Sequence, residues 1–385
     1  MEYTLRTYQQ ESSDAAIEYL TGKSKKNAMI VLPTGSGKSL VIAAIAKGLD
    51  APVLIFQPSK EILEQNFNKL ASYGILDCSI YSASFNSKKI SRITFATIGS
   101  IKNNAELFEH FKYIIIDECH FVNAKKGMYK AFLDQVPCKV LGLTATPYRL
   151  STDGFGGSIL KFLTRTRPRV FADLIYHSQI SELLEAGHLA KLEYYNIDAV
   201  DVSELKINST GADFTDESVK SYYEKIQFDK KLTEVVERLI NAGRNEILVF
   251  TRFIDEAEQL VSRLNVRAEI VTGKTKKKDR ERILNEFKTG QIKVIANVGV
   301  LTTGFDYPEL STIVLARPTR SLALYYQMVG RAIRPHKNKK SGWIIDMCQT
   351  YERFGKVEDL KLESSKPNLW HIESNGKQLT NVYYE

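Results

Sequence analysis

The sequence predicts an α/β protein of two consecutive domains, each a parallel sheet flanked by helices. The first observation is length, because 385 residues correspond to two domains at roughly 150 residues each. The second is an alternation of short apolar runs with helix-length segments, which is typical of parallel strands joined by crossover helices. The third is that this alternation occurs twice. The composition, 43% hydrophobic and 25% charged, excludes a disordered or collagen-like chain.

The first set of apolar runs predicts the buried strands of one sheet. Each run is bounded by turn residues or followed by a mixed segment of helix length, as in a βαβ unit. The expected strands are Ala28–Leu32, Val53–Phe56, Ile93–Ala96, Tyr113–Ile116 and Val140–Leu143.

The same rhythm starts again after about residue 190 and predicts a second sheet. Its expected strands are Leu192–Ile197, Ile247–Phe250, Glu269–Thr272, Val294–Ala296, Thr312–Leu315 and Gly342–Ile345. A helix is expected at Gln179–Ala186, with Gly187 as its C-cap, just before the boundary. We therefore expect domains at 1–188 and 189–350, followed by a short tail or subdomain at 351–385.

Charge and cysteine content narrow the class of protein. Lys+Arg 53 against Asp+Glu 45 gives a net charge of +8, which favours a polyanionic partner. The 4 cysteines stand far apart without a CxxC pair, so we expect no disulfide framework, no zinc site and a reducing compartment. No apolar run reaches about 18 residues, and the N-terminus is polar. We expect no membrane span and a cytoplasmic location, in a bacterium or a phage-infected host.

A glycine-rich loop follows the first expected strand. Residues 32–39 read LPTGSGKS, with Leu where the strict phosphate-loop pattern has Gly, and a helix is expected at Leu40–Gly48. Backbone N–H groups of such a loop surround phosphate oxygens, and the helix N-terminus adds positive potential. We expect the Lys38 ammonium to reach the β- and γ-phosphates and the Ser39 hydroxyl to ligate Mg²⁺. The other residues expected at the phosphates are Thr34, Gly35, Ser36 and Gly37.

A later apolar strand ends in two carboxylates and a histidine, because residues 113–120 read YIIIDECH. A parallel strand brings Asp117 to its carboxyl end beside the loop, where it can hold Mg²⁺ through water. Glu118 can take a proton from the attacking water. His120 could couple a nucleotide site to a nucleic-acid site, or simply pack.

DECH at 117–120, with TATP at 144–147, resembles motifs II and III of superfamily 2 helicases of the DEXH type. The other motifs of that family follow in order, and the resemblance runs from residue 5 to about 345. They are LRTYQ at 5–9, QPSKEILEQ at 57–65, FATIGS at 95–100, LVFTR at 248–252, VGVLTTGFD at 298–306 and YQMVGRAIR at 326–334. Within the superfamily the motif sequences are most similar to those of RadD-like DNA repair helicases, with the phage helicase UvsW more distant.

The resemblance implies two tandem RecA-like domains with ATP and Mg²⁺ in the cleft between them. It implies that Arg6 and Gln9 belong to a segment that reads adenine. Motif V is implied to contribute Gly304 and Asp306 to the nucleotide site, and Asp306 could bind the ribose hydroxyl or orient the arginines of motif VI. It also implies that two threonines of motif III, Thr144 and Thr146, link the nucleotide site to the nucleic-acid site.

Three residues of motif VI, Gln327, Arg331 and Arg334, are spaced i, i+4 and i+7. We therefore expect them on one face of a helix. Presented across the cleft to a γ-phosphate, the arginines would neutralise transition-state charge only when the domains close. The alternative is an exposed basic helix face.

A group of mostly small polar residues resembles the family's contacts to the nucleic-acid backbone. Small hydroxyls and free N–H groups hold phosphates without reading bases. The group comprises Pro58, Ser59, Lys60, Thr97, Arg252, Thr272, Gly273, Thr302 and Thr303. Individually such residues could equally cap helices, but as a set they predict a groove that follows the backbone.

These observations together predict a nucleic-acid-dependent ATPase. We expect a monomeric DNA helicase or translocase that acts on single-stranded, duplex or branched DNA in repair, recombination or replication. Three alternatives remain open. They are an RNA helicase, the motor subunit of a restriction system, and an ATP-gated nucleic-acid clamp that binds without travelling.

Overall fold

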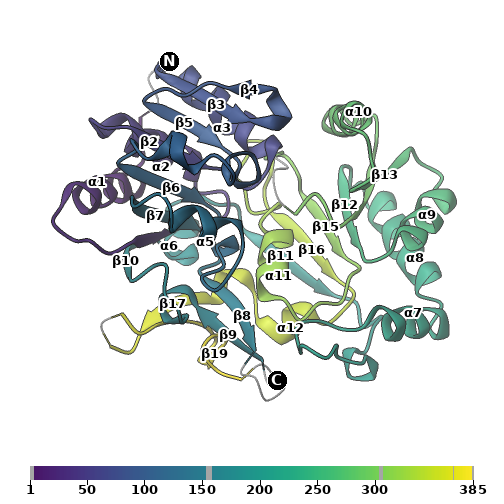
Figure 1. Cartoon of the computed structure of the whole chain (residues 1–385). Coiled ribbons are helices and arrows are strands. Elements are labelled where there is room, and N and C mark those ends of the chain that lie inside the picture. The colour runs from purple at the N-terminus through teal and green to yellow at the C-terminus, as the bar shows by residue number, and fades with distance from the viewer. Residues whose placement is uncertain (1–3, 153–157, 303–306, 367, 384–385) are drawn as a thin grey trace.

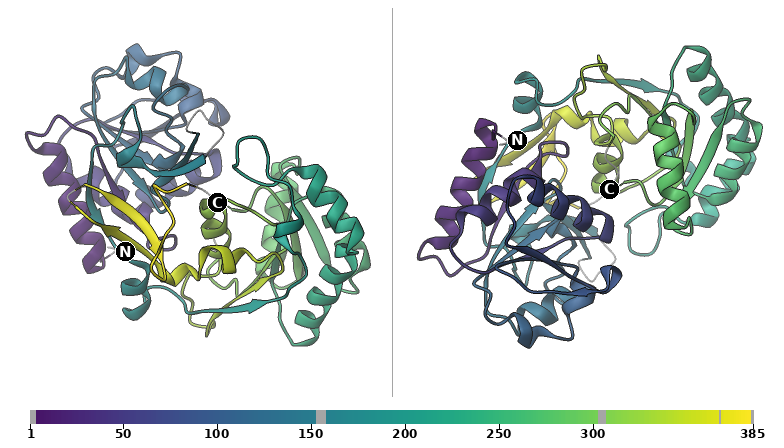
Figure 2. Two further views of the ribbon diagram at one scale, coloured as in Figure 1. Left: turned by 90° about the horizontal axis from the view of Figure 1, so that it is seen from below. Right: turned by 90° about the horizontal axis from the view of Figure 1, so that it is seen from above.

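The computed structural model describes residues 4–152, 158–302, 307–366 and 368–383. Two α/β units follow each other along the chain, and a small C-terminal sheet lies beside the first of them (Figures 1 and 2). No helix among these residues is long and apolar enough to cross a membrane.

The first sheet has the strand order β10-β1-β7-β6-β2-β5-β3-β4, and every neighbouring pair is parallel except β3–β4. Its central strands are buried along their whole length, because helices cover a parallel sheet on both faces. The strands are β1 (Ala28–Val31), β2 (Val53–Phe56), β3 (Cys78–Ser82), β4 (Ser87–Lys88), β5 (Ile93–Ala96), β6 (Tyr113–Asp117), β7 (Lys139–Thr144) and β10 (Asp173–His177).

Helices and a separate hairpin complete the first unit. The helices are α1 (Thr7–Thr21), α2 (Lys38–Gly48), α3 (Lys60–Ser72), α4 (Ile98–Ile101), α5 (Met128–Leu133) and α6 (Ile180–Glu185). The 3₁₀ turns of this unit include Ala83–Phe85, Ala105–Phe108, η3 (Cys119–Phe121) and Leu163–Arg165, and a further one, Val202–Glu204, belongs to the second unit. The hairpin pairs β8 (Tyr148–Thr152) with β9 (Ser158–Phe162) antiparallel.

The second sheet is parallel throughout, with the order β11-β16-β15-β12-β14-β13. Its strands are β11 (Leu192–Asn196), β12 (Ile247–Thr251), β13 (Ala268–Thr272), β14 (Val294–Val298), β15 (Thr312–Leu315) and β16 (Gly342–Asp346). Its helices are α7 (Asp216–Lys225), α8 (Phe228–Asn241), α9 (Ile254–Arg263), α10 (Lys277–Lys288), α11 (Leu322–Val329) and α12 (Thr350–Phe354). In Figure 1, α11 lies on the side of this unit that faces the first one.

The C-terminal residues form a three-stranded antiparallel sheet that packs against the first unit. Its strands are β17 (Leu360–Ser364), β18 (Trp370–Ser374) and β19 (Lys377–Gln378), after the 3₁₀ turn η6 (Val357–Asp359). The side-chain amide of Gln179, which precedes α6, bonds both backbone groups of Leu362, at 2.8 and 3.0 Å. The chain thus leaves the second unit at α12 and returns to the first.

Every strand expected from the sequence is present, with bounds that differ by at most two residues at either end. The helix expected before the boundary is α6, and Gly187 follows it with a φ of 69°. The two tandem RecA-like sheets are therefore confirmed. Strands β3, β4 and β10, the β8–β9 hairpin and the C-terminal sheet were not expected.

Candidate active site

The glycine-rich loop joins the end of β1 to the first residue of α2, Lys38. Gly35 and Gly37 take φ values of 84° and 83°, a left-handed conformation that favours glycine. A Cβ at Gly37 would stand 2.6 Å from the Nε2 atom of Gln9, so space as well as φ requires glycine there. The two glycines therefore allow the loop to turn tightly at the N-terminus of α2, where backbone N–H groups attract anions.

Helix α1 holds the loop from behind. The Tyr8 hydroxyl and the Gln9 Nε2 both donate to the carbonyl oxygen of Ser36, at 2.6 and 2.8 Å. Gln9 and Ser36 are buried there, and neither lines the cavity in front of the loop, whereas Arg6 does. Gln9 therefore supports the shape of the loop, and its expected role in reading adenine stays a prediction.

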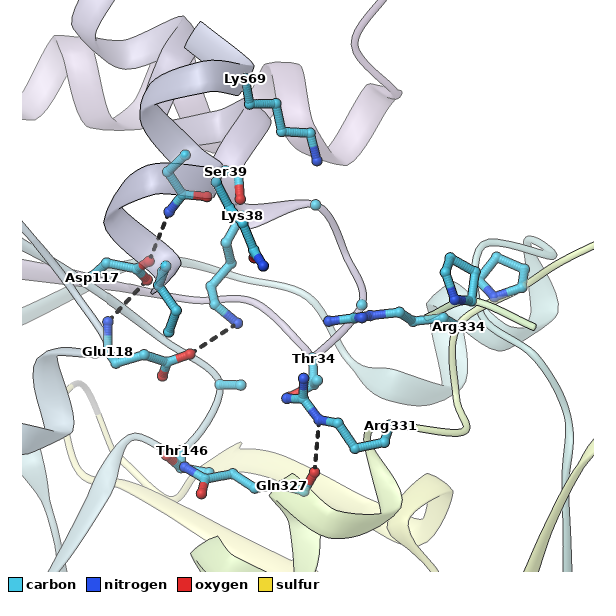
Figure 3. Close-up of a pocket in the computed structure, with 18 of the residues that line it drawn as sticks. Thr34, Lys38, Ser39, Lys69, Asp117, Glu118, Thr146, Gln327, Arg331 and Arg334 are labelled. Carbon is cyan, nitrogen blue, oxygen red and sulfur yellow. Dashed lines mark hydrogen bonds and ion pairs between the residues drawn. The ribbon is translucent and has the colours of Figure 1, made fainter. Parts of the chain in front are cut away.

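The two acidic residues follow β6 directly. Asp117 is the last residue of the strand and is buried, and its Oδ1 accepts from the Glu118 backbone N–H at 2.9 Å. Glu118 has a φ of 49°, an uncommon conformation for a residue with a side chain. This turn points the Glu118 carboxylate toward the loop, where its Oε1 lies 3.8 Å from the Lys38 ammonium (Figure 3).

The pKa values of the two carboxyl groups shift in opposite directions. Burial, and then the Glu118 carboxylate, raise the pKa of Asp117, and Lys38 only partly opposes them. Burial would also raise the pKa of Glu118, but Lys38 and His120 outweigh it and lower that pKa. In this arrangement Glu118 is ionised, and Asp117 is a buried carboxyl group that a cation would keep ionised.

His120 belongs to η3 and is buried, with its Nδ1 close to three oxygens. These are the hydroxyls of Thr144 and Thr146, at 2.9 and 3.0 Å, and the Glu118 Oε2 at 3.4 Å. The structure thus brings together the three residues expected to couple the sites, and joins them to the carboxylate beside Lys38.

A cavity of about 320 Å³ opens in front of the loop and is lined from both units. The second unit contributes Gln327, Arg331 and Arg334, which Figure 3 shows reaching in from the side opposite Lys38. The remaining residues of the predicted nucleotide site that line it are Arg6, Thr34, Gly35, Gly37, Ser39, Asp117, Glu118 and Thr146.

The expectation that Gln327, Arg331 and Arg334 share one helix face is wrong. Helix α11 ends at Val329, and the chain turns at Gly330, so only Gln327 is helical. A Cβ at Gly330 would stand 2.8 Å from the Thr34 Cγ2, so the chain approaches the phosphate loop closely just after the helix. The turn nevertheless brings both arginines to the cavity, and Arg331 Nε donates to the Gln327 carbonyl oxygen at 3.3 Å.

Sequence reasoning missed part of the cavity wall. Helix α3 contributes Ile62, Gln65, Asn66 and Lys69, and Asn66 Nδ2 lies 3.4 Å from the Asp117 Oδ2. Their spacing, i, i+3, i+4 and i+7, is that of one helix face and could have identified them.

Three expected residues of motif V, Thr303, Gly304 and Asp306, lie outside the described residues. The other residues expected to contact nucleic acid stand at the carboxyl ends of neighbouring strands. Pro58, Ser59 and Lys60 follow β2, Thr97 follows β5, and Thr272, Gly273 and Thr302 follow β13 and β14.

Several of these residues also make local contacts. The Ser59 hydroxyl accepts from the Ile62 N–H at the start of α3, and the Thr272 hydroxyl accepts from the Lys274 N–H. Ser59 therefore caps helix α3, as the helix-capping alternative expects. All of these residues nevertheless lie near the carboxyl ends of strands.

Two ion pairs join this region of the two units. Lys277 lies 3.5 Å from Glu64, and Arg280 lies 3.7 Å from Glu61. Because α3 follows the Pro58–Lys60 segment and α10 follows Thr272, the two strand-end groups lie on the same side of the molecule.

Arg252 differs from the rest of the expected nucleic-acid group. Only 8% of its side chain is exposed, and its guanidinium lies 2.7 Å from the Asp216 carboxylate and 3.7 Å from that of Asp213. It also donates to the carbonyl oxygen of Phe214 at 2.7 Å. Arg252 therefore ties the 213–216 segment to the end of β12, and its guanidinium is not exposed as a contact to nucleic acid would require.

The residues present fit a nucleotide with a divalent cation. The buried Asp117 carboxyl group and the Ser39 hydroxyl line the same cavity, and oxygen ligands of this kind are those that Mg²⁺ prefers. Lys38, Arg331 and Arg334 supply positive charge to the cavity, which matches a polyphosphate.

Comparisons with known proteins agree with this architecture. Residues 2–149 match the family described as type III restriction enzyme, res subunit, and residues 230–336 match the helicase conserved C-terminal domain. The chain is 28% identical to the 51.5 kDa protein of a Lactococcus phage, over 85% of this chain and 67% of that protein. It is 22% identical to the ATP-dependent DNA helicase uvsW of Enterobacteria phage T4, over 88% of this chain and 67% of that protein.

A solved structure shows the same fold. It is the ATP-dependent type ISP restriction-modification enzyme LlaBIII bound to DNA, with a TM-score of 0.66 and 18% identity, over 90% of this chain and 28% of that one. The chain spans about half to two thirds of the length of the first curated relatives it matches, 67%, 51% and 60%. Because both helicase domain families match the chain and residues of motifs I, II, III and VI line one cavity, the chain belongs to the superfamily 2 helicases.

Proposed function

We propose that this protein hydrolyses ATP in the cavity between its two RecA-like domains and uses the reaction to move on, or remodel, DNA. The observation that carries the proposal is the composition of that cavity. One wall holds a phosphate loop and a carboxylate pair, and the opposite wall holds two arginines from the other domain. Such a site is complete only when both domains contribute, which makes hydrolysis sensitive to their relative position.

Each residue of the cavity has a role in this chemistry. Lys38 and the loop N–H groups bind the phosphates, and Ser39 and Asp117 would hold Mg²⁺, which neutralises phosphate charge. Glu118, ionised beside Lys38, accepts a proton from the attacking water. Arg331 and Arg334 stabilise the charge that develops on the transferred phosphoryl group.

The proposal of DNA as the partner is supported by the relatives. The name of the T4 relative describes an ATP-dependent DNA helicase, and that of the restriction enzyme describes a protein bound to DNA. The strand-end residues of both domains, without Arg252, supply hydroxyls and N–H groups for a phosphate backbone. The net charge of +8 favours the same partner.

An ATPase panel tests this proposal. The assay compares single-stranded DNA, duplex DNA, forks, Holliday junctions and single-stranded RNA as activators of the same preparation. We expect stimulation by at least one form of DNA. Stimulation by RNA alone would contradict the DNA assignment and favour the RNA helicase. A second assay measures whether the enzyme displaces another protein bound to duplex DNA. Full stimulation of the ATPase without such displacement would favour the clamp.

A second candidate is the motor part of a restriction system. It is favoured by the family matched by residues 2–149 and by the restriction enzyme that shares the fold. Copurification of this chain with a nuclease and a methyltransferase from its native host would support it. Full DNA translocation by the chain alone, with no such partner, would favour the helicase.

We further propose that the protein acts as a monomer in the cytosol of a bacterium or a phage-infected host. The wide spacing of its 4 cysteines, without a CxxC pair, supports a reducing compartment. Light scattering during sizing chromatography tests the monomer directly.

A further inference from the structure

A tyrosine at the interface joins the two domains at the phosphate loop. Tyr326 lies in α11, and its hydroxyl accepts a hydrogen bond from the Thr34 backbone N–H at 3.0 Å. Only 3% of Tyr326 is exposed. Burial raises the pKa of Tyr326 to about 12, so the phenol is neutral at physiological pH and can accept from an amide.

Two further contacts seat the same segment on the loop. Gly330 packs closely against the Thr34 side chain, and a Cβ at Gly35 would stand 3.2 Å from the Arg334 Cγ. Residues 326–334 therefore touch Thr34 and Gly35 at three points. Of these points, the Tyr326–Thr34 hydrogen bond is the directional one.

We propose that Tyr326 is a positioning residue for the ATPase, one that links the shape of the phosphate loop to closure of the domains. Thr34 stands at the entrance of the loop, immediately before Gly35 with its left-handed backbone. A buried backbone N–H needs a partner, and in the closed arrangement that partner comes from the other domain. When the domains separate, water takes its place.

The consequence is reciprocal coupling. If the Tyr326 hydroxyl stabilises the loop shape only in the closed form, nucleotide binding and domain closure favour each other by the same factor. Loss of a buried hydrogen bond that leaves an amide unpaired weakens the closed form by about five- to thirty-fold. The role in turnover rests on the proposed function, whereas the effect on nucleotide binding does not.

The test replaces Tyr326 by phenylalanine, which keeps the ring and removes the hydroxyl. Tyr325→Phe is the matched control, because Tyr325 is also buried in α11 and its hydroxyl donates to the Gly355 carbonyl oxygen at 2.9 Å, away from the loop. The first measurement is the Kd of a non-hydrolysable ATP analogue with Mg²⁺ and without nucleic acid. The second is the DNA concentration that gives half-maximal ATPase.

Both quantities are expected to rise about five- to thirty-fold in Tyr326→Phe and to stay within about twofold in Tyr325→Phe. Unchanged analogue binding in Tyr326→Phe, or an equal loss in both variants, would overturn the proposal. If no nucleic acid stimulates the wild type, the proposed function fails, and analogue binding still decides the role of Tyr326.

Hydrogen exchange gives a measurement on the wild type should Tyr326→Phe fold poorly. The Thr34 amide is expected to be protected without nucleotide, and more strongly with the analogue. Exchange of this amide at the rate of an open loop, with or without the analogue, would overturn the proposal.

Discussion

Removing one arginine from the second domain is expected to slow hydrolysis far more than it weakens ATP binding. Arg331 is 7% exposed and lines the cavity. Burial raises the pKa of Glu118, and Arg331 helps Lys38 and His120 to lower it. A desolvated arginine that stabilises a phosphoryl transition state contributes about 10³- to 10⁵-fold to turnover. Because Arg334 remains on the same wall, we expect the lower end, about 10³-fold in kcat for Arg331→Ala.

ATP affinity should change by less than about tenfold in this variant, since the loop and Lys38 are untouched. The assay is steady-state ATPase over a range of ATP and DNA concentrations. Arg263→Ala is the control, because Arg263 is also in the second domain, pairs with Asp229 and does not line the cavity. Its turnover should match the wild type.

The competing hypothesis is that Arg331 only contacts DNA. In that case Arg331→Ala would bind DNA more weakly, and saturating DNA would restore full ATPase. Recovery of the wild-type kcat at saturation would therefore refute the arginine-finger reasoning.

Three further predictions concern single side chains. Lys38→Ala should abolish ATP binding or turnover because the phosphate charge loses its partner, and normal DNA-stimulated ATPase would contradict the site. Glu118→Gln should keep nucleotide binding and trap a DNA-bound closed state, and unchanged turnover would place the base elsewhere. Glu256 is the third, because burial raises its pKa from 4.5 to about 8 although the Phe253 and Arg252 N–H groups donate to it. Stability should therefore fall as pH rises from about 4.5 to 8, by roughly 3–5 kcal/mol at most, and Glu256→Gln should remove that part of the slope. Urea denaturation of both proteins at pH 5.5 and pH 8 checks this, and parallel pH dependences would contradict it.

The buried strands and the residues at their carboxyl ends were predictable from the sequence. A strand buried on both faces is a continuous apolar run, as in Tyr113–Ile116, and such a run is visible without a partner. The polar residue that ends each run then lies at one edge of the sheet, which brings Lys38 and Glu118 together.

Edge strands and inter-domain contacts were not predictable in this way. Strand β10 is half-exposed along its length, and β17 alternates buried and exposed residues, so neither forms an apolar run. Helix α11 ends at Val329, where the following Gly330 packs closely against Thr34 of the other domain. No periodicity within one segment contains that information.

The position of Glu118 makes hydrolysis responsive to the rest of the molecule. Its carboxylate is held from two sides, by Lys38 of the phosphate loop and by His120, which is bonded to two threonines after and at the end of β7. Strand β7 pairs with both β1 and β6, and the backbone N–H of Leu32, at the start of the phosphate loop, donates to the Thr144 carbonyl oxygen at 3.1 Å. A shift at the end of β7 would therefore reach both the phosphate loop and His120. A general base must lie within hydrogen-bond reach of its water, and a displacement of about 1 Å can slow a reaction about 10²-fold. We therefore expect Thr146, which lines the cavity and bonds His120, to influence hydrolysis through the position of Glu118.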